Sequence, residues 1–374
     1  MLTLAVIINI VCIINSAILA IVLLLNKPKI LANQILAYIV FIPSLALLVN
    51  SLIEMKFYKA AIILFPVDMS LNFLWGAAFY YFVSIATKQW QGFKKSKLLH
   101  LLSLIIPLSF FIWLFSKPES FQNAYFDSVN SKTIPPFLFI VDNLMILQIL
   151  IYFIFSYLKL KRYEKSITEI YSQIESVQLK WIKHFITMCV SLWLLLMFPF
   201  VFFPTLTFFM YFLPIGSAAL YVYIVYKSLH SKTALNPISI ELKEAFADVA
   251  KKKSEQNTNS DLEIEKRYEK IMAYLNEKKP YLETEINITK FSNLINESVH
   301  NVSVAINQKF NMSFFDLINS YRIDEAKAHL KNQKLSKLTV EAIAFEVGFN
   351  TPSSFYRAFK KHTNQTPSQF IKSI

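Results

Sequence analysis

Residues 352–362 place two kinds of side chain on opposite faces of a predicted helix. Phe355 and Phe359 repeat at a spacing of four, which is typical of a face that packs into a core. The opposite face carries groups that can hydrogen-bond to DNA. A guanidinium can bind both acceptors on the major-groove edge of guanine, whereas an ammonium group more often contacts phosphate. The residues on this polar face are Ser353, Tyr356, Arg357, Lys360 and Lys361.

A second polar helix is predicted at residues 299–310, and its outward positions carry no arginine. Amide side chains can recognise adenine, so this helix is a weaker candidate for the same chemistry. For Arg357 a second interpretation stays open, an ion pair with a helix neighbour such as Glu346. The outward positions of the second helix are His300, Asn301, Ser303, Val304 and Asn307.

Both polar helices follow a turn and a capping residue. Ser298 and Thr351 stand where a side-chain oxygen can accept from the free N–H groups of the first helical turn. Gly348 is the one glycine after residue 227, and it ends the preceding helix where a left-handed backbone suits glycine. Asn296 occupies the comparable turn in the first unit. These signals predict two helix-turn-helix units, at about 284–312 and 338–364.

The two units repeat at an offset of 53 residues, since AINQKFNMSFFDLI (305–318) matches AFKKHTNQTPSQFI (358–371). A long helix at 313–331 joins them. Two units on one connector suit two successive major grooves, which recur every ~34 Å along one face of DNA. The periodicity predicts helices and no strands. The predicted helices are 262–279, 288–295, 299–310, 313–331, 339–347, 352–362 and 367–372.

The stretch 284–371 resembles the DNA-binding domain of the AraC/XylS family. The resemblance rests on INSYRIDEAKAHL (318–330), IAFEVGF (343–349), F-x-R-x-FKK (355–361) and TPSQF (366–370). It implies a seven-helix double helix-turn-helix fold, sequence-specific transcription control, and a sensory domain on the same chain. Asn364 replaces the family's usual glycine, and Val304 stands where an arginine is common. The base-contacting positions that the resemblance implies are His300, Ser303, Val304, Ser353, Tyr356 and Arg357.

The chain before residue 227 has a different composition. Of the 374 residues 55% are hydrophobic, and the mean hydropathy is +0.41. A membrane-spanning helix needs ~20 mainly apolar residues. Seven segments qualify: 2–25, 30–53, 60–87, 98–115, 136–158, 181–203 and 205–226. We therefore expect an all-α protein: a seven-helix transmembrane, sensory domain (1–227), a cytoplasmic helix and flexible linker (228–261), and the DNA-binding domain (262–374).

The cations of the short loops predict the orientation of this bundle. With the N-terminus outside, the inner loops hold 12 Lys and Arg and the outer loops hold 4. Lys and Arg are enriched in cytoplasmic loops. The expected location is therefore a bacterial inner membrane, crossed several times, with the C-terminal domain in the cytoplasm, where DNA is found.

Two aspartates, Asp68 and Asp142, lie within the predicted spans. Ionisable groups there are functional candidates, and these two are the candidate sensing residues. The alternative is an interfacial position or a structural hydrogen bond. They would also suit a transporter or channel whose tail regulates its own gene. The signal, whether a small molecule, a lipid or a protein, is not given by the sequence.

The loop between the fifth and sixth spans carries an apolar stripe with alternating spacings of three and four. Such a stripe can pair with a second copy of the chain, or lie flat on the membrane. Because the chain must return to begin the sixth span, a flat or broken helix is favoured, and a homodimer stays open. The stripe consists of Leu160, Tyr163, Ile167, Ile170, Ile174, Val177 and Trp181.

The sequence contains no phosphate-binding loop, no cluster with metal-ligand spacing, and no nucleophile with an adjacent base. We therefore expect no enzyme activity, no cofactor and no metal. The expected partners are double-stranded DNA and the lipid bilayer. Residues 281–374 carry a net charge of only +3. Since phosphate neutralisation supplies most of the non-specific affinity, a single domain should bind weakly and two copies should be needed.

Overall fold

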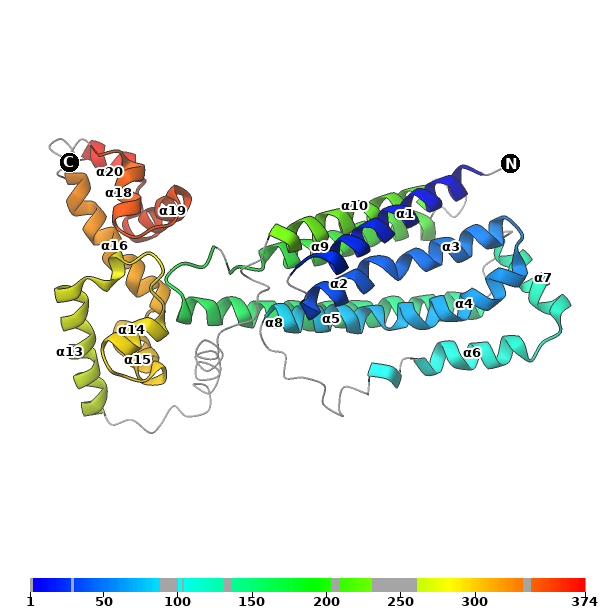
Figure 1. Ribbon diagram of the computed structural model, residues 1–374, viewed down its shortest axis with the longest axis horizontal. Coiled ribbons are helices and arrows are strands. Elements are labelled where there is room, and N and C mark those ends of the chain that lie inside the picture. Colours follow the sequence, from blue (N-terminus) through cyan, green and yellow to red (C-terminus); the bar gives the residue numbers. More distant parts are fainter. Residues whose placement is uncertain are drawn as a thin grey trace. The chain divides into compact units, whose positions relative to one another are not determined.

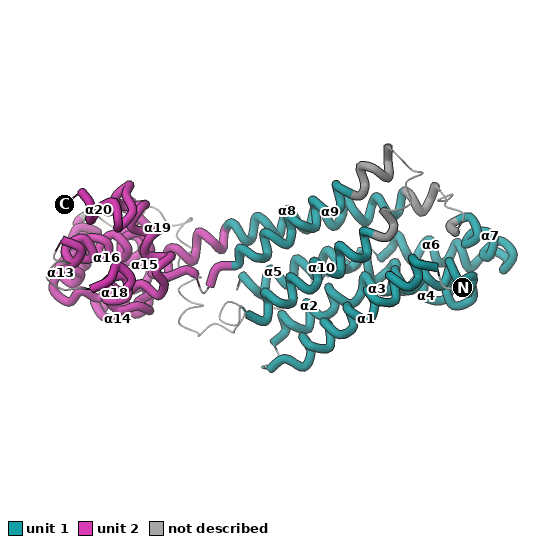
Figure 2. Tube along the Cα trace, turned by 90° about the horizontal axis from the view of Figure 1, so that it is seen from above, with its two compact units in different colours: residues 1–161, 179–236 teal, residues 162–178, 237–374 magenta. Residues whose placement is uncertain are grey.

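The computed structural model describes residues 3–27, 30–87, 100–102, 104–130, 136–175, 177–202, 209–230, 261–331 and 338–373. Over these ranges the chain is helical, without strands, apart from one isolated antiparallel bridge between Tyr171 and Asn287. Most of the predicted helix and linker at 228–261 lies outside the described residues. The chain divides into two units (Figure 2): residues 1–161 with 179–236, and residues 162–178 with 237–374.

The first unit consists of long apolar helices. Pro43 begins a new helix directly after Ile42, and Leu74 separates two further helices, so two of the predicted spans are each built from two consecutive helices. The described helices are α1 (Leu4–Leu25), α2 (Leu31–Phe41), α3 (Pro43–Glu54), α4 (Tyr58–Phe73), α5 (Trp75–Ala86), α6 (Ile105–Phe115), α7 (Glu119–Asn130), α8 (Pro136–Ile170), α9 (Lys180–Phe202) and α10 (Phe209–His230).

Five helical stretches among the described residues are long and apolar enough to cross a membrane. The region of α6 is apolar but shorter. Each of the seven predicted spans overlaps a helix or a pair of helices, but the number seven stays a prediction. Residues 203–208, between the last two, lie outside the described ranges. The five stretches are Leu4–Leu25, Leu31–Glu54, Tyr58–Ala86, Ile140–Ile170 and Phe212–His230.

The second unit is built from short helices, and the predicted boundaries agree with it to within two residues. The predicted helix 299–310 continues as a π-helix in its second half. The elements are α13 (Asp261–Lys278), η2 (Pro280–Leu282), α14 (Ile288–Leu294), α15 (Val299–Ala305), η3 (Ile306–Phe310), α16 (Phe314–Lys331), α18 (Val340–Glu346), α19 (Pro352–Thr363) and α20 (Pro367–Ser373).

Two apolar cores hold this unit together, and α16 contributes to both (Figure 1). Phe314, Leu317 and Ile318 at its start pack with α13, α14 and α15. Ile323, Ala326 and Leu330 further along pack with α18 and α19. Because one helix carries both cores, it fixes the spacing between the two helix-turn-helix units.

Residues 162–178, from the predicted membrane domain, belong to the second unit. The helix of the predicted stripe ends at Ile170, and α9 begins only at Lys180. Ile170 is fully buried in the first core of the second unit. The helix is therefore broken, which was one of the two favoured alternatives, and Ile170 at the break packs inside the second unit, not against lipid. The homodimer stays a prediction. The Tyr163 hydroxyl donates to the Val177 carbonyl at 3.0 Å and closes the break.

Candidate nucleic-acid interface

The first helix-turn-helix unit consists of α14, a tight turn and α15. Asn296 has φ +51°, and the amides of Asn296 and Glu297 donate to the carbonyls of Asn293 and Ser292. This is the hydrogen-bond pattern of a Schellman turn. The Ser298 hydroxyl then accepts from the Asn301 amide at 3.1 Å and caps α15.

The second unit repeats this arrangement with α18 and α19. Gly348 has φ +93°, and the amides of Gly348 and Phe349 donate to the carbonyls of Phe345 and Ala344. The Thr351 hydroxyl accepts from the Ser354 amide at 3.2 Å and caps α19. Both turns therefore set a capped helix at an angle to its predecessor, as a helix that enters a groove requires.

The polar face of α19 is open to solvent. Ser353, Arg357, Lys360 and Lys361 are exposed and Tyr356 is partly exposed, whereas Phe355 and Phe359 are fully buried. Lys361 forms an ion pair with Asp316 at 2.5 Å.

The predicted contact residues of the first unit are less accessible than those of α19. His300, Val304 and Asn307 are partly exposed, and Ser303 is only 2% exposed. The structure therefore brings four exposed polar groups together on α19. On α15 and η3 the predicted contact residues are only partly exposed, and Ser303 is buried.

Acidic side chains of one segment contact both helices. We refer to residues 169–175 as the docking segment. Glu169 accepts from the Asn307 amide group at 2.9 Å, and Glu175 lies 3.6 Å from the Arg357 guanidinium. The ion pair of Arg357 is thus made with Glu175 and not with Glu346, which contacts His329 at 3.4 Å.

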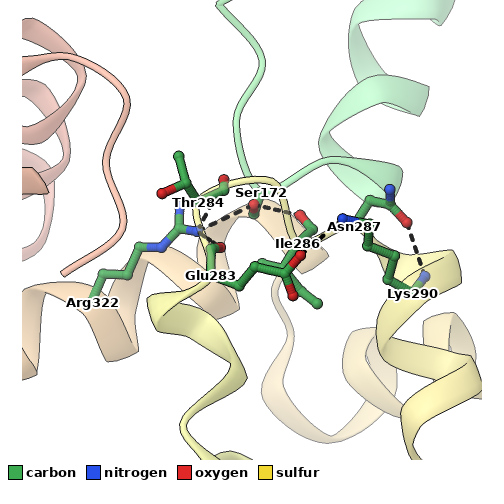
Figure 3. A network of polar contacts seen from close by, with 7 residues as sticks. All are labelled: Ser172, Glu283, Thr284, Ile286, Asn287, Lys290 and Arg322. Atoms are coloured by element: carbon green, nitrogen blue, oxygen red, sulfur yellow. Dashed lines mark hydrogen bonds and ion pairs between the residues drawn. The ribbon is translucent and has the colours of Figure 1, made fainter. Parts of the chain in front are cut away.

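Arg322 of α16 ties the docking segment to the turn before α14 (Figure 3). Its guanidinium donates to the carbonyls of Tyr281 at 2.6 Å and Glu283 at 2.8 Å, and it reaches the Ser172 hydroxyl at 3.4 Å. Ser172 in turn donates to the Ile286 carbonyl at 2.6 Å. Arg322 is fully buried, and burial lowers its pKa to about 9 against the opposing effect of Glu175.

A cavity of about 50 Å³ lies between the docking segment, α16 and α19. Glu175 Oε2 and Asn319 Oδ1 are buried side-chain oxygens with no hydrogen-bond partner in the described part of the chain. Buried polar atoms are normally paired. These two oxygen atoms are therefore unpaired at the contact of the docking segment with α16 and α19, and Nη1 of Arg322 likewise has no hydrogen-bond partner among the described residues. Residues lining the cavity include Ser172, Glu175, Asn319, Arg357, Lys361 and His362.

The two candidate sensing residues of the first unit differ in their surroundings. Asp68 is buried in α4, and its carboxylate accepts from the Asn72 side chain at 2.6 Å. Asp142 is exposed on α8. Asp68 thus has the structural hydrogen bond that was the alternative to a sensing role. In the described ranges no three His, Cys, Asp or Glu side chains gather as a metal site would require.

Sequence reasoning missed Arg322 and the docking segment as parts of this surface. Arg322 did carry a signal, because it interrupts the apolar series Ile318, Ala326 and Leu330 at a spacing of four and so had to be buried with partners. The sequence of the docking segment gave no signal of its contacts with the helix-turn-helix units. Its partners at Ile286 and Gly348 are more than a hundred residues away in the sequence.

The comparisons with known proteins concern this C-terminal region. Residues 293–373 match a family described as a helix-turn-helix domain. The class of the region is therefore a helix-turn-helix domain of the AraC type. No solved structure matches the chain with significance.

Two relatives are similar to the same part of the chain. An uncharacterized HTH-type transcriptional regulator of Staphylococcus aureus (strain COL) is 29% identical over 86 residues, which is 23% of this chain and 11% of that protein. Another, in the cgkA 5′ region of Pseudoalteromonas carrageenovora, is 35% identical over 89 residues, or 22% of this chain and 53% of that protein. The chain therefore spans about half of one relative and a tenth of the other.

Proposed function

We propose that the chain is a membrane-embedded transcription regulator that binds promoter DNA sequence-specifically through its C-terminal domain. The observation that carries the proposal is the pair of capped helices, α15 and α19, held at a fixed spacing by α16. The similarity to proteins named HTH-type transcriptional regulators supports it.

In this proposal α19 supplies most of the contacts. Arg357 reads a guanine edge through two hydrogen bonds, and Ser353 and Tyr356 approach neighbouring bases. Lys360 and Lys361 contact phosphates and so position the helix without specifying sequence. The first helix contributes shape and fewer hydrogen bonds, through His300, Val304 and Asn307, because Ser303 is buried.

The first unit is proposed to lie in the membrane. Large aliphatic side chains such as Ile63, Ile112 and Ile154 are exposed on its helices, and most exposed hydrophobic residues among the described ones belong to this unit. Apolar surface of this extent suits contact with lipid and not with water. The excess of cations in the predicted inner loops supports a cytoplasmic C-terminal domain.

The signal is proposed to act on the first unit, with Asp68 and Asp142 as candidate residues for sensing it. A signal that binds one arrangement of the bundle more tightly shifts the population towards that arrangement. Two copies of the chain at paired promoter sites would raise the effective DNA concentration for each domain and offset its low net charge.

The test uses the full chain in lipid nanodiscs. Binding sites are first selected from random duplexes, and affinity for the selected site is then compared with affinity for a shuffled duplex. We expect a preference of at least tenfold, which Arg357→Ala reduces. The variant Lys278→Ala, which removes a cation from α13, is the matched control. Equal affinity for both duplexes would refute DNA recognition.

A further inference from the structure

The docking segment brings a carboxylate to each of the two helices that we propose enter DNA. Glu169 is 7% exposed and hydrogen-bonds to Asn307, at the end of the first. Glu175 pairs with Arg357, the main candidate for base recognition on the second. Carboxylates at these positions would meet DNA phosphates, and like charges repel.

One end of the segment is firmly anchored. Ile170 is fully buried in the first core, and Ser172 is hydrogen-bonded to both Ile286 and Arg322 (Figure 3). The Gln173 side chain donates to the Gly348 carbonyl at 2.6 Å and accepts from the Asn350 amide at 3.3 Å. These contacts attach the segment to the stretch before α14 and to the turn between α18 and α19.

The other end is held weakly. The Glu175–Arg357 pair spans 3.6 Å, and the two side chains are 29% and 57% exposed. The second Glu175 oxygen has no hydrogen-bond partner among the described residues. An ion pair between one exposed and one partly exposed side chain contributes little to stability. Glu175 can therefore leave Arg357 while residues 170–173 stay in place.

We propose that the docking segment is an autoinhibitory latch, in which Glu175 competes with DNA for Arg357 while residues 170–173 keep the segment attached to the domain. The proposal rests on the proposed DNA binding. The segment begins in the last turn of α8 and leads towards α9, so a change at the end of α8 reaches the latch through the chain itself. Because the segment is covalently continuous with the first unit through α8, a change in the first unit can alter the access of DNA to Arg357 in this proposal.

The size of the effect follows from competition. A state that must open before it binds has its affinity reduced by the open fraction. An ion pair of this exposure corresponds to an opening factor of about two to five. Removing the charge of Glu175 should therefore tighten DNA binding about two- to fivefold.

The experiment measures the affinity of the full chain in nanodiscs for its selected duplex and for a shuffled one. Glu175→Gln is compared with Glu277→Gln, which removes the same charge from an exposed position on α13. We expect tighter binding for Glu175→Gln only. The gain should disappear when Arg357→Ala is also present, because the pair then no longer exists.

A second measurement follows amide hydrogen exchange with and without saturating duplex, and it needs no variant. The Gln178 amide donates to the Ile174 carbonyl at 2.9 Å at the weak end, and the Ser172 amide donates to Ile286 at the anchor. We expect DNA to speed exchange at Gln178 and to leave Ser172 protected.

The outcomes separate the latch from the function. If the wild-type chain does not distinguish the two duplexes, the proposed function fails. If it does, but Glu175→Gln behaves like Glu277→Gln or binds more weakly, the latch is overturned and the function stands. Unchanged exchange at Gln178 on DNA binding likewise overturns the latch.

Discussion

The substitution Gly348→Ala tests the geometry of the turn that sets the orientation of α19. A Cβ atom built at Gly348 would lie 2.8 Å from the Leu282 carbonyl oxygen and 2.9 Å from that of Tyr281. Real Cβ contacts are longer, so the turn must shift, and forced packing of this kind costs about 1–3 kcal/mol. The φ of +93° adds about 1–2 kcal/mol for any residue with a Cβ. We expect a total loss of about 2–5 kcal/mol, against a typical domain stability of about 5–15 kcal/mol.

The assay is amide hydrogen exchange of the full chain in nanodiscs, followed at Val347 and Phe349, whose amides donate to Ile343 and Ala344. Exchange reports the free energy of local opening. A loss of 2–5 kcal/mol accelerates it by about 30-fold to several thousandfold, since 1.4 kcal/mol is tenfold. Asn296→Gly is the control, because it relieves a positive φ at the equivalent turn and should not destabilise it. If Gly348→Ala accelerated exchange at Val347 and Phe349 by less than about threefold, this explanation of the turn would be refuted.

Four further predictions concern substitutions of charged groups. Arg322→Lys should lower the free energy of unfolding by about 2–4 kcal/mol in denaturant titrations, because buried carbonyl acceptors lose their donors. The hydrogen bond from Lys279 lowers the pKa of Glu325. A carboxyl with a lowered folded pKa contributes stability that is present above its unfolded pKa of about 4.3 and is lost as the pH falls through the folded pKa. In the variant Glu325→Gln the free energy of unfolding should therefore depend less on pH between about pH 5 and 3 than in the wild-type chain. Arg357→Ala should cost about 1–3 kcal/mol of discrimination between duplexes, whereas Lys360→Ala should reduce the salt dependence of binding by about one ion, as salt titrations will show.

The sequence predicted the helices of the second unit well because their boundaries are set by local chemistry. Ser298 and Thr351 cap the helices that follow them, and Gly348 and Asn296 have the positive φ that their turns require. Such signals act within four residues, so they can be recognised without knowledge of the fold.

Contacts made at long range could not be predicted in this way. An ion pair of Arg357 was among the interpretations of the sequence, but its partner is Glu175, 182 positions away. The apolar stripe from Leu160 to Trp181 suggested a surface for lipid or for a second copy. Periodicity shows only that a face is buried, not what buries it, and Ile170 at the break packs against residues of the C-terminal unit.

The burial of Ile170 also concerns the boundary of the helix-turn-helix unit. A division at residue 262 follows the composition of the chain, but it removes a fully buried side chain from the first core. Burial of an isoleucine contributes about 1.5–3 kcal/mol. It also removes Ser172, which donates to Ile286 and faces Arg322. Helix α8 runs from Pro136 to Ile170 without a break. Helix α8 therefore contributes to both units, since its residues up to 161 belong to the first and residues 162–170 to the second.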